Sequence, residues 1–281
     1  MAGPATYMNV RSTWTPAARA QLAPALLAVV CYLGALTNGF AWDDVFIVQN
    51  SELIHHWATV PSALHLAYWY NSDHLYRPLT TLSFAVDWLL LGGSPAVFHA
   101  VNIAWHALAS ALVARLALRW WSPLTAAAGG CIFAVQPVHV EAVANIVGRS
   151  ELMCAVALLA LALVATRPLT VDADITPWYR VAVIGALAAV ATASKETGAV
   201  APVVAWAATW LTANRTSPGP RRSAVRPTIQ ATAAACIGVV FELAVRLHAI
   251  GGLGGDRPHP AFRMSTGWQS TTLALATLHE P

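Results

Sequence analysis

Long uncharged apolar segments constrain the fold of this chain more than any other feature. One of them runs from Pro24 to Thr37 without a charged side chain. Apolar residues make up 57% of the 281 residues and charged residues only 10%, whereas soluble domains have about 25% charged residues. A membrane helix needs roughly 20 apolar residues, and a membrane β-barrel would instead show alternating polarity. The sequence therefore predicts an all-α, polytopic transmembrane helical bundle.

Seven segments are long and apolar enough to cross a bilayer when tilt is allowed for. They lie near residues 17–37, 97–118, 122–136, 150–166, 178–194, 198–213 and 228–249. The first lacks a convincing small-residue cleavage site, which favours a retained helix over a cleaved signal peptide. We expect residues 1–249 to form the transmembrane region. Residues 250–281 are expected to form an outer loop and the start of a truncated further segment.

The apolar segment from Pro78 to Leu91 is short for a span and contains Asp87. It is predicted to be a re-entrant or interfacial helix in a long outer loop, residues 38–96. An eighth span here would reverse the orientation of every later segment. With seven spans and a cytoplasmic N-terminus, ten arginines lie inside and six basic residues outside, as the positive-inside rule favours. The basic loop 214–227 then lies in the cytoplasm.

Acidic residues, cysteines and net charge limit the kinds of site to consider. Eleven of the 13 acids fall on the outer side, and because acids contribute little to orientation, this asymmetry indicates chemistry there. The four cysteines lie in apolar segments without CxxC spacing, so neither a disulfide nor a zinc site is expected. A net charge of +3 with scattered arginines predicts no nucleic-acid partner.

Two adjacent carboxylates, Asp43 and Asp44, follow the first apolar segment in the motif FAWDD. Acids this close influence each other's protonation, which suits a general base or a cation site beside a cavity. The alternative is structural, because aspartate is favoured at the N-cap and first turn of a helix beginning at Val45. The two interpretations have about equal weight on spacing alone. No cofactor is predicted, and a divalent metal is left open.

Two basic residues stand out on the predicted outer side. Arg77, in the motif YRP, could hold a phosphate or simply pair with Asp73. Lys195 is the only lysine and precedes Glu196 in the motif SKETG. A lone lysine at a helix end is usually a snorkelling anchor. An anchor needs no adjacent glutamate, however, which favours a functional role for Lys195.

Other polar residues of this side give weaker signals. His139 and Glu141 would share a face only in extended structure, which Pro137 favours. Glu242 and Arg246 are four residues apart on one predicted helix, so we expect an intrahelical ion pair without a catalytic role. Four histidines in the outer loop are most simply interfacial and give only a weak metal signal. They are His55, His56, His65 and His74.

Five motifs together resemble the transmembrane and tetratricopeptide-repeat-containing protein family of the GT-C glycosyltransferase superfamily. They occur in the family's order and cover most of residues 38–200. The motifs are FAWDD (40–44), YRPLTTLSF (76–84), FHAVNIAWHAL (98–108), PVHVEAVANIVGRSELM (137–153) and SKETG (194–198). The family's later membrane helices and its C-terminal repeat array have no counterpart in these 281 residues.

The resemblance implies a GT-C-like, inverting glycosyltransferase that takes mannose or a similar hexose from a polyprenyl-phosphate donor in the membrane lipid. The acceptor would be a protein or glycan hydroxyl, foremost serine or threonine. Transfer would occur on the non-cytoplasmic face of a bacterial plasma membrane or the endoplasmic reticulum. Asp43 would be the general base and Asp44 would orient it. By their chemistry and predicted topology, Arg77, Arg149 and Lys195 are the candidate cations for the phosphate. His139 and Glu141 are expected to line the same cavity, and Glu196 is a further candidate substrate-binding residue.

A polytopic transporter or flippase is the alternative from another functional class. A transporter should carry polar groups near the bilayer midplane and two related halves. In this sequence the ionisable residues gather at one side and no internal repeat is visible, which favours the enzyme. An inactive truncated remnant is the third interpretation.

Overall fold

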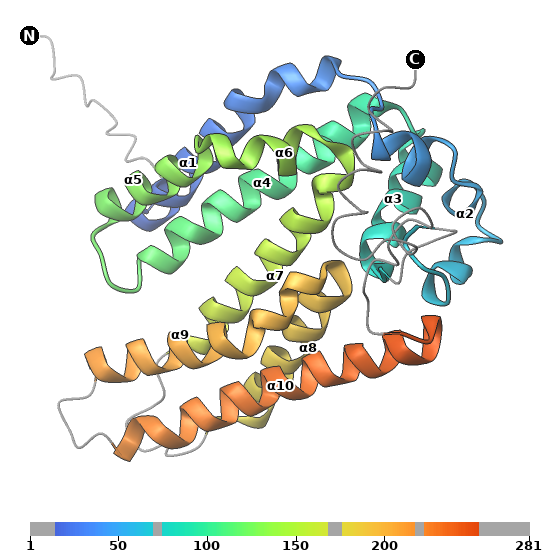
Figure 1. Ribbon diagram of the computed structural model, residues 1–281. Helices are drawn as coiled ribbons and strands as arrows, with labels where there is room; N and C mark the ends of the chain where they lie inside the picture. The colour runs from blue at the N-terminus through green and yellow to red at the C-terminus, as the bar shows by residue number, and fades with distance from the viewer. Residues whose placement is uncertain (1–14, 70–74, 168–175, 217–221, 253–281) are drawn as a thin grey trace, which may run out of the picture.

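The computed structural model describes residues 15–69, 75–167, 176–216 and 222–252 (Figure 1). These residues form helices, turns and loops, and none of them lies in a strand. The predicted all-α helical bundle is therefore confirmed. Predictions that concern Asp73, His74, the centre of loop 214–227 and most of residues 250–281 lie outside the described residues.

Four described helical segments are long and apolar enough to cross a membrane, consistent with an integral membrane protein. They are α1 (Pro16–Tyr32) with the 3-10 turn η1 (Leu33–Thr37), α4 (Pro95–Ala117), α7 (Arg149–Ala165) with the preceding turn η5 (Ile146–Gly148), and α10 (Arg222–Ile250). A fifth results if α5 (Pro123–Ala134) and the segment Pro137–Ala144, bent by 51°, form one span.

Two shorter helices complete the bundle, α8 (Trp178–Ser194) and α9 (Ala201–Thr216). A helix thus occupies each of the seven predicted ranges, and the number that crosses the membrane stays a prediction.

Local sequence signals explain where two of these helices begin. The side chain of Thr15 accepts a hydrogen bond from the N–H of Ala18 (3.2 Å), directly before a proline. Ser122 does the same for the N–H of Thr125 (3.3 Å), again before a proline. The first N–H groups of a helix lack intrahelical partners, so a hydroxyl cap followed by proline is favoured there. The sequence thus defines the N-termini of α1 and α5.

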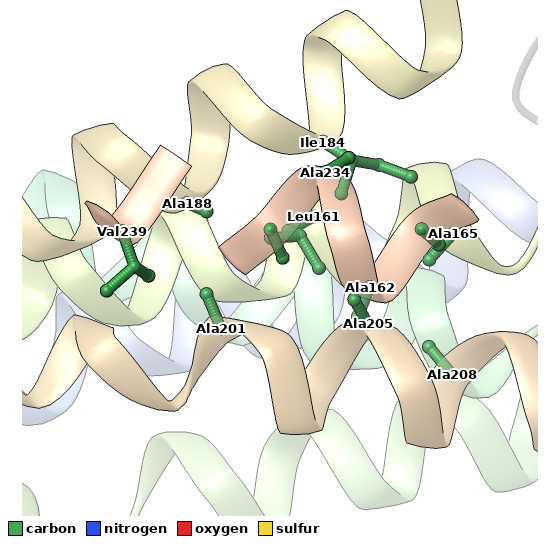
Figure 2. Close-up of a cluster of buried hydrophobic side chains, with 12 residues drawn as sticks. Leu161, Ala162, Ala165, Ile184, Ala188, Ala201, Ala205, Ala208, Ala234 and Val239 are labelled. Carbon is green, nitrogen blue, oxygen red and sulfur yellow. The ribbon is translucent and has the colours of Figure 1, made fainter. Parts of the chain in front are cut away.

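Small side chains hold α7, α8, α9 and α10 together, as Figure 2 shows for the alanines around Leu161 and Ile184. The backbones of α8 and α10 approach so closely that a Cβ on Gly238 would lie 2.0 Å from the carbonyl oxygen of Gly185. Membrane helices commonly pack through small residues in this way. The four helices form a close-packed frame. The SKETG motif begins at the last residue of α8, and its last three residues lie in the turn η6 (Glu196–Val200) between α8 and α9.

The segment between α1 and α4 lies over one end of the bundle (Figure 1). It contains the short π-helical turn η2 (Val45–Gln49), the short helix α2 (Glu52–His55), the 3-10 turn η3 (Val60–Leu64) and the helix α3 (Pro78–Leu91). Helix α3 ends at Gly92, which has a φ of 88° and terminates the helix in the left-handed conformation that glycine favours. The bounds of α3 equal those of the predicted interfacial helix, and its depth in the membrane remains a prediction.

The orientation can be tested at two exposed positions, Glu52 in α2 and Trp121 in the turn between α4 and α5. These segments lie at opposite ends of the bundle (Figure 1). In a protein whose native cysteines have been replaced, we expect a membrane-impermeant maleimide to label Glu52→Cys only from outside. Trp121→Cys should react only after permeabilisation, because it follows the arginine-rich end of α4 that the positive-inside rule predicts to be cytoplasmic. Labelling of both positions from the same side would contradict the topology.

Candidate active site

The two adjacent aspartates have different environments. Asp43 is exposed, whereas Asp44 is buried. Asp44 Oδ1 accepts a hydrogen bond from the N–H of Val147 (2.9 Å), and its Oδ2 accepts one from the N–H of Ala41 (3.3 Å). Burial raises the pKa of Asp44, against the lowering effect of these backbone hydrogen bonds. Asp44 thereby fastens the segment between α1 and α4 to the turn before α7.

The interpretation of the acidic pair as a helix N-cap is wrong for Asp44. Its side chain makes no capping hydrogen bond to the turn η2 that follows. A second close contact fixes the partner turn, because a Cβ on Gly148 would lie 2.6 Å from the carbonyl oxygens of Glu141 and Ala142. Only glycine avoids this clash. The turn that receives Asp44 is therefore held in place from both sides.

Arg77 pairs with Glu196 across 119 positions of sequence. Its Nη2 donates to Glu196 Oε2 at 2.8 Å and its Nε donates to the same oxygen at 3.1 Å. The Arg77 guanidinium also lies over the ring of Tyr68, 5.0 Å from the ring centre. Burial raises the pKa of Glu196, but the hydrogen bonds and charge of Arg77 outweigh it and lower that pKa overall. Glu196 is therefore a carboxylate that holds Arg77 at the end of the bundle.

Lys195 does not pair with Glu196, the acid that follows it in the sequence. Its Nζ forms an ion pair with Oε1 of Glu151, in the first turn of α7. The hydroxyl of Thr80 donates to the carbonyl oxygen of Ser194 (2.9 Å), which ties α3 to the end of α8 beside this lysine. The lysine side chain is 19% exposed and that of Glu151 is 48% exposed. Among the paired cations of the site, Lys195 is the most open to solvent.

Arg149 occupies the interior and is fully buried. Its Nη1 lies 2.5 Å from Asp87 Oδ2, and its Nε donates to Asn102 Oδ1 at 2.8 Å. The guanidinium also lies over the ring of Phe84, 4.8 Å from the ring centre. The protein itself uses these donors to join α3, α4 and α7. This arrangement favours a structural role for Arg149.

His139 and Glu141 lie in helical structure, so the expectation of an extended segment is wrong. Residues Pro137–His139 form a 3-10 turn and Val140–Ala144 form the helix α6. The His139 ring packs 4.4 Å from the ring centre of Phe133, and Glu141 is exposed. None of the contacts described links either residue to Arg77 or Lys195.

The described histidines of the segment between α1 and α4 have ordinary structural partners or an exposed position. The His55 ring stacks on Trp88 at 3.7 Å between ring centres, and its Nε2 is 3.0 Å from the carbonyl oxygen of Val48. His56 lies 3.4 Å from Glu52 at the surface. Within the described part of the chain, no group of three or more metal-ligating side chains is found. The weak metal signal thus gains no support from these residues.

Sequence reasoning missed several partners, including Glu151, Asp87 and Asn102. Asn102 and Glu151 lie within the quoted motifs and Asp87 lies in the segment Pro78–Leu91, but pairing between segments far apart in sequence cannot be read from spacing. For the expected ion pair between Glu242 and Arg246, the charge of Arg246 acts on the Glu242 carboxylate, but neither oxygen of that carboxylate has a hydrogen-bond partner among the described residues. Arg246 Nη1 instead lies 3.9 Å from Glu196 Oε1.

The predicted resemblance is confirmed by comparison with known proteins. The chain is 32% identical over 178 residues to protein O-mannosyl-transferase TMTC3 of Homo sapiens, covering 61% of this chain and 19% of that protein. It is 36% identical over 141 residues to protein O-mannosyl-transferase Tmtc2 of Drosophila melanogaster (47% and 15%), and 35% identical over 156 residues to TMTC1 of Mus musculus (49% and 16%). The match therefore spans about a fifth or less of these relatives. No family model and no solved structure matches.

Proposed function

We propose that this chain is the membrane portion of a protein O-mannosyl-transferase, as its similarity to proteins of that name suggests. It transfers mannose from a polyprenyl-phosphate donor to a serine or threonine hydroxyl on the non-cytoplasmic face. One observation carries the proposal: at one end of the bundle, segments far apart in sequence are joined by two polar contacts, one made by an acid with a backbone N–H and the other by an acid with a cation. The segments contain Asp44, Arg77, Val147 and Glu196.

In this reaction the acceptor oxygen attacks the anomeric carbon and the bond from that carbon to the phosphate oxygen breaks. The lipid phosphate leaves with the bonding electrons, and the acceptor proton passes to a general base. Asp43 suits this role because its carboxylate is exposed at the end of the bundle where an acceptor protein can approach. Asp44 is a positioning residue, since its two backbone hydrogen bonds fix the loop that carries Asp43.

The leaving phosphate requires positive charge, which Arg77 and Lys195 supply in the proposal. Their acidic partners hold them in place before the donor arrives, so little reorganisation is needed when the phosphate binds. Glu196 and Glu151 then stay in place and share these cations with the phosphate. His139 and Glu141 have a smaller part, because the described contacts do not link them to the cations.

Lys195→Ala is expected to weaken donor affinity by roughly 10- to 100-fold, since a hydrogen bond between charged groups contributes about 1.5–3 kcal/mol. Acceptor affinity should stay unchanged, because the lysine acts on the phosphate. Binding of a short-chain prenyl phosphomannose to the full-length protein measures the effect, with Lys195→Arg as the charge-preserving control. Unchanged donor affinity in Lys195→Ala would return this residue to the role of a snorkelling anchor.

The donor class can be tested directly with the full-length protein in liposomes. Polyprenyl phosphomannose should support transfer to a serine- and threonine-containing protein, whereas a nucleotide sugar should not. The lipid chain keeps the donor phosphate at the interface beside the cations, and a nucleotide sugar lacks this anchor. Transfer from the nucleotide sugar alone would contradict the proposal, and so would transport of the lipid without any transfer.

A further inference from the structure

A buried acid of α10 is left unexplained by the proposed reaction. Glu242 is only 4% exposed, and neither of its carboxylate oxygens has a hydrogen-bond partner among the described residues. An ionised carboxylate that is buried without a hydrogen bond is strongly disfavoured. Such a side chain either binds a ligand or holds a proton.

The charges around Glu242 come from several elements. Arg246 is one turn further along α10, and its Nη1 lies 3.9 Å from Oε1 of Glu196 in η6. Glu196 in turn holds Arg77, at the start of α3. Burial together with the charge of Glu242 raises the pKa of Tyr76, whose hydroxyl donates to a backbone carbonyl in η3. Glu242 therefore belongs electrostatically to the Arg77 and Glu196 site.

The charge balance of this cluster depends on one proton. Arg77 and Arg246 contribute two positive charges and Glu196 one negative charge. An ionised Glu242 makes the cluster neutral, and a protonated Glu242 leaves it with one positive charge. The neighbouring pairs Lys195 with Glu151 and Arg149 with Asp87 are each neutral and do not change this balance.

We propose that Glu242 is a further member of the anion site and is protonated when that site holds a phosphodiester. A protonated Glu242 gives the cluster one positive charge, which matches the single negative charge of a lipid-linked sugar phosphate. Its hydroxyl also becomes a donor that can hydrogen-bond a phosphate or sugar oxygen. This inference rests on the proposed donor site, and it adds that donor binding takes up a proton.

The coupling of donor binding to protonation of Glu242 sets the direction in which donor affinity changes with pH. The bound anion makes loss of the Glu242 proton less favourable, so donor affinity is highest at low pH and falls as Glu242 ionises in the free protein. Coupling to one proton lowers affinity by at most about tenfold per pH unit. Glu242→Gln keeps a neutral side chain of similar shape, so its donor affinity should stay near the low-pH value of the wild type at every pH. The exposed Glu52→Gln is the matched control and should retain the wild-type pH dependence.

The experiment uses the full-length protein and a short-chain prenyl phosphomannose, whose phosphodiester keeps one charge between about pH 5 and pH 9. Calorimetry in buffers of different ionisation enthalpy measures both affinity and proton uptake. We expect net proton uptake by the wild type and by Glu52→Gln, and none by Glu242→Gln. Binding of the probe by the wild type without proton uptake at any pH would overturn the Glu242 assignment while leaving the donor site intact. Undiminished uptake by Glu242→Gln would also overturn it. Failure of the wild type to bind the probe would instead contradict the proposed function.

Discussion

Asp43→Asn is expected to slow sugar transfer by about 10²–10⁴-fold, the usual contribution of a general base. The amide keeps the size of the carboxylate but cannot take the acceptor proton. Donor affinity should remain near the wild-type value, because the proposed phosphate cations are other residues. Transfer rate and donor binding are measured on the same preparation of the full-length protein, with protein yield as the folding control.

Asp44→Asn separates catalysis from positioning. Asparagine keeps one acceptor oxygen for the N–H of Val147 but presents its NH₂ group where a second acceptor faced the N–H of Ala41. We therefore expect a smaller loss of rate than for Asp43→Asn, together with reduced thermal stability. Equal rates for wild type and Asp43→Asn would contradict the base assignment.

Arg149→Met should destabilise the protein by about 3–5 kcal/mol, because it leaves the buried Asp87 carboxylate without its cation. Arg149 is fully buried and its side chain joins three helices, so the effect should appear in folding and not only in activity. The midpoint of thermal unfolding in detergent gives the measurement.

The double variant Arg149→Met with Asp87→Leu provides the control. Replacing both members of a buried ion pair with apolar residues is often tolerated, so we expect it to recover much of the lost stability. A double variant no more stable than Arg149→Met would contradict the pairing as the cause. An unchanged unfolding midpoint in the single variant would contradict the structural role.

Helix positions could be predicted closely from the sequence because apolar length and proline or hydroxyl caps are local signals. The bounds of α3 illustrate this, since Pro78 begins the helix and Gly92 ends it. The charge pairs could not be predicted in the same way. Lys195 and Glu196 are adjacent in sequence, yet backbone geometry directs them to different partners, Glu151 and Arg77.

The site also shows why residue type alone misleads at this end of the bundle. Arg149 has the chemistry of a phosphate cation, but it lies in the interior, where Asp87 and Asn102 engage it. Glu242 and Arg246 have ideal i, i+4 spacing, but Arg246 Nη1 lies near Glu196 on another element. Helical periodicity reveals neighbours on one helix, whereas the contacts that build this site join segments more than 40 positions apart.

Transfer of mannose to protein by a base at Asp43 is tested most directly by the modified acceptor. Full-length protein in liposomes is incubated with polyprenyl phosphomannose and an acceptor protein, and mass spectrometry maps hexose on serine and threonine. We predict modified hydroxyls with the wild type and almost none with Asp43→Asn at equal protein level and donor occupancy. Unmodified acceptor with the wild type would contradict the transfer of mannose to protein, and equal modification by both proteins would contradict the role of Asp43 as the base.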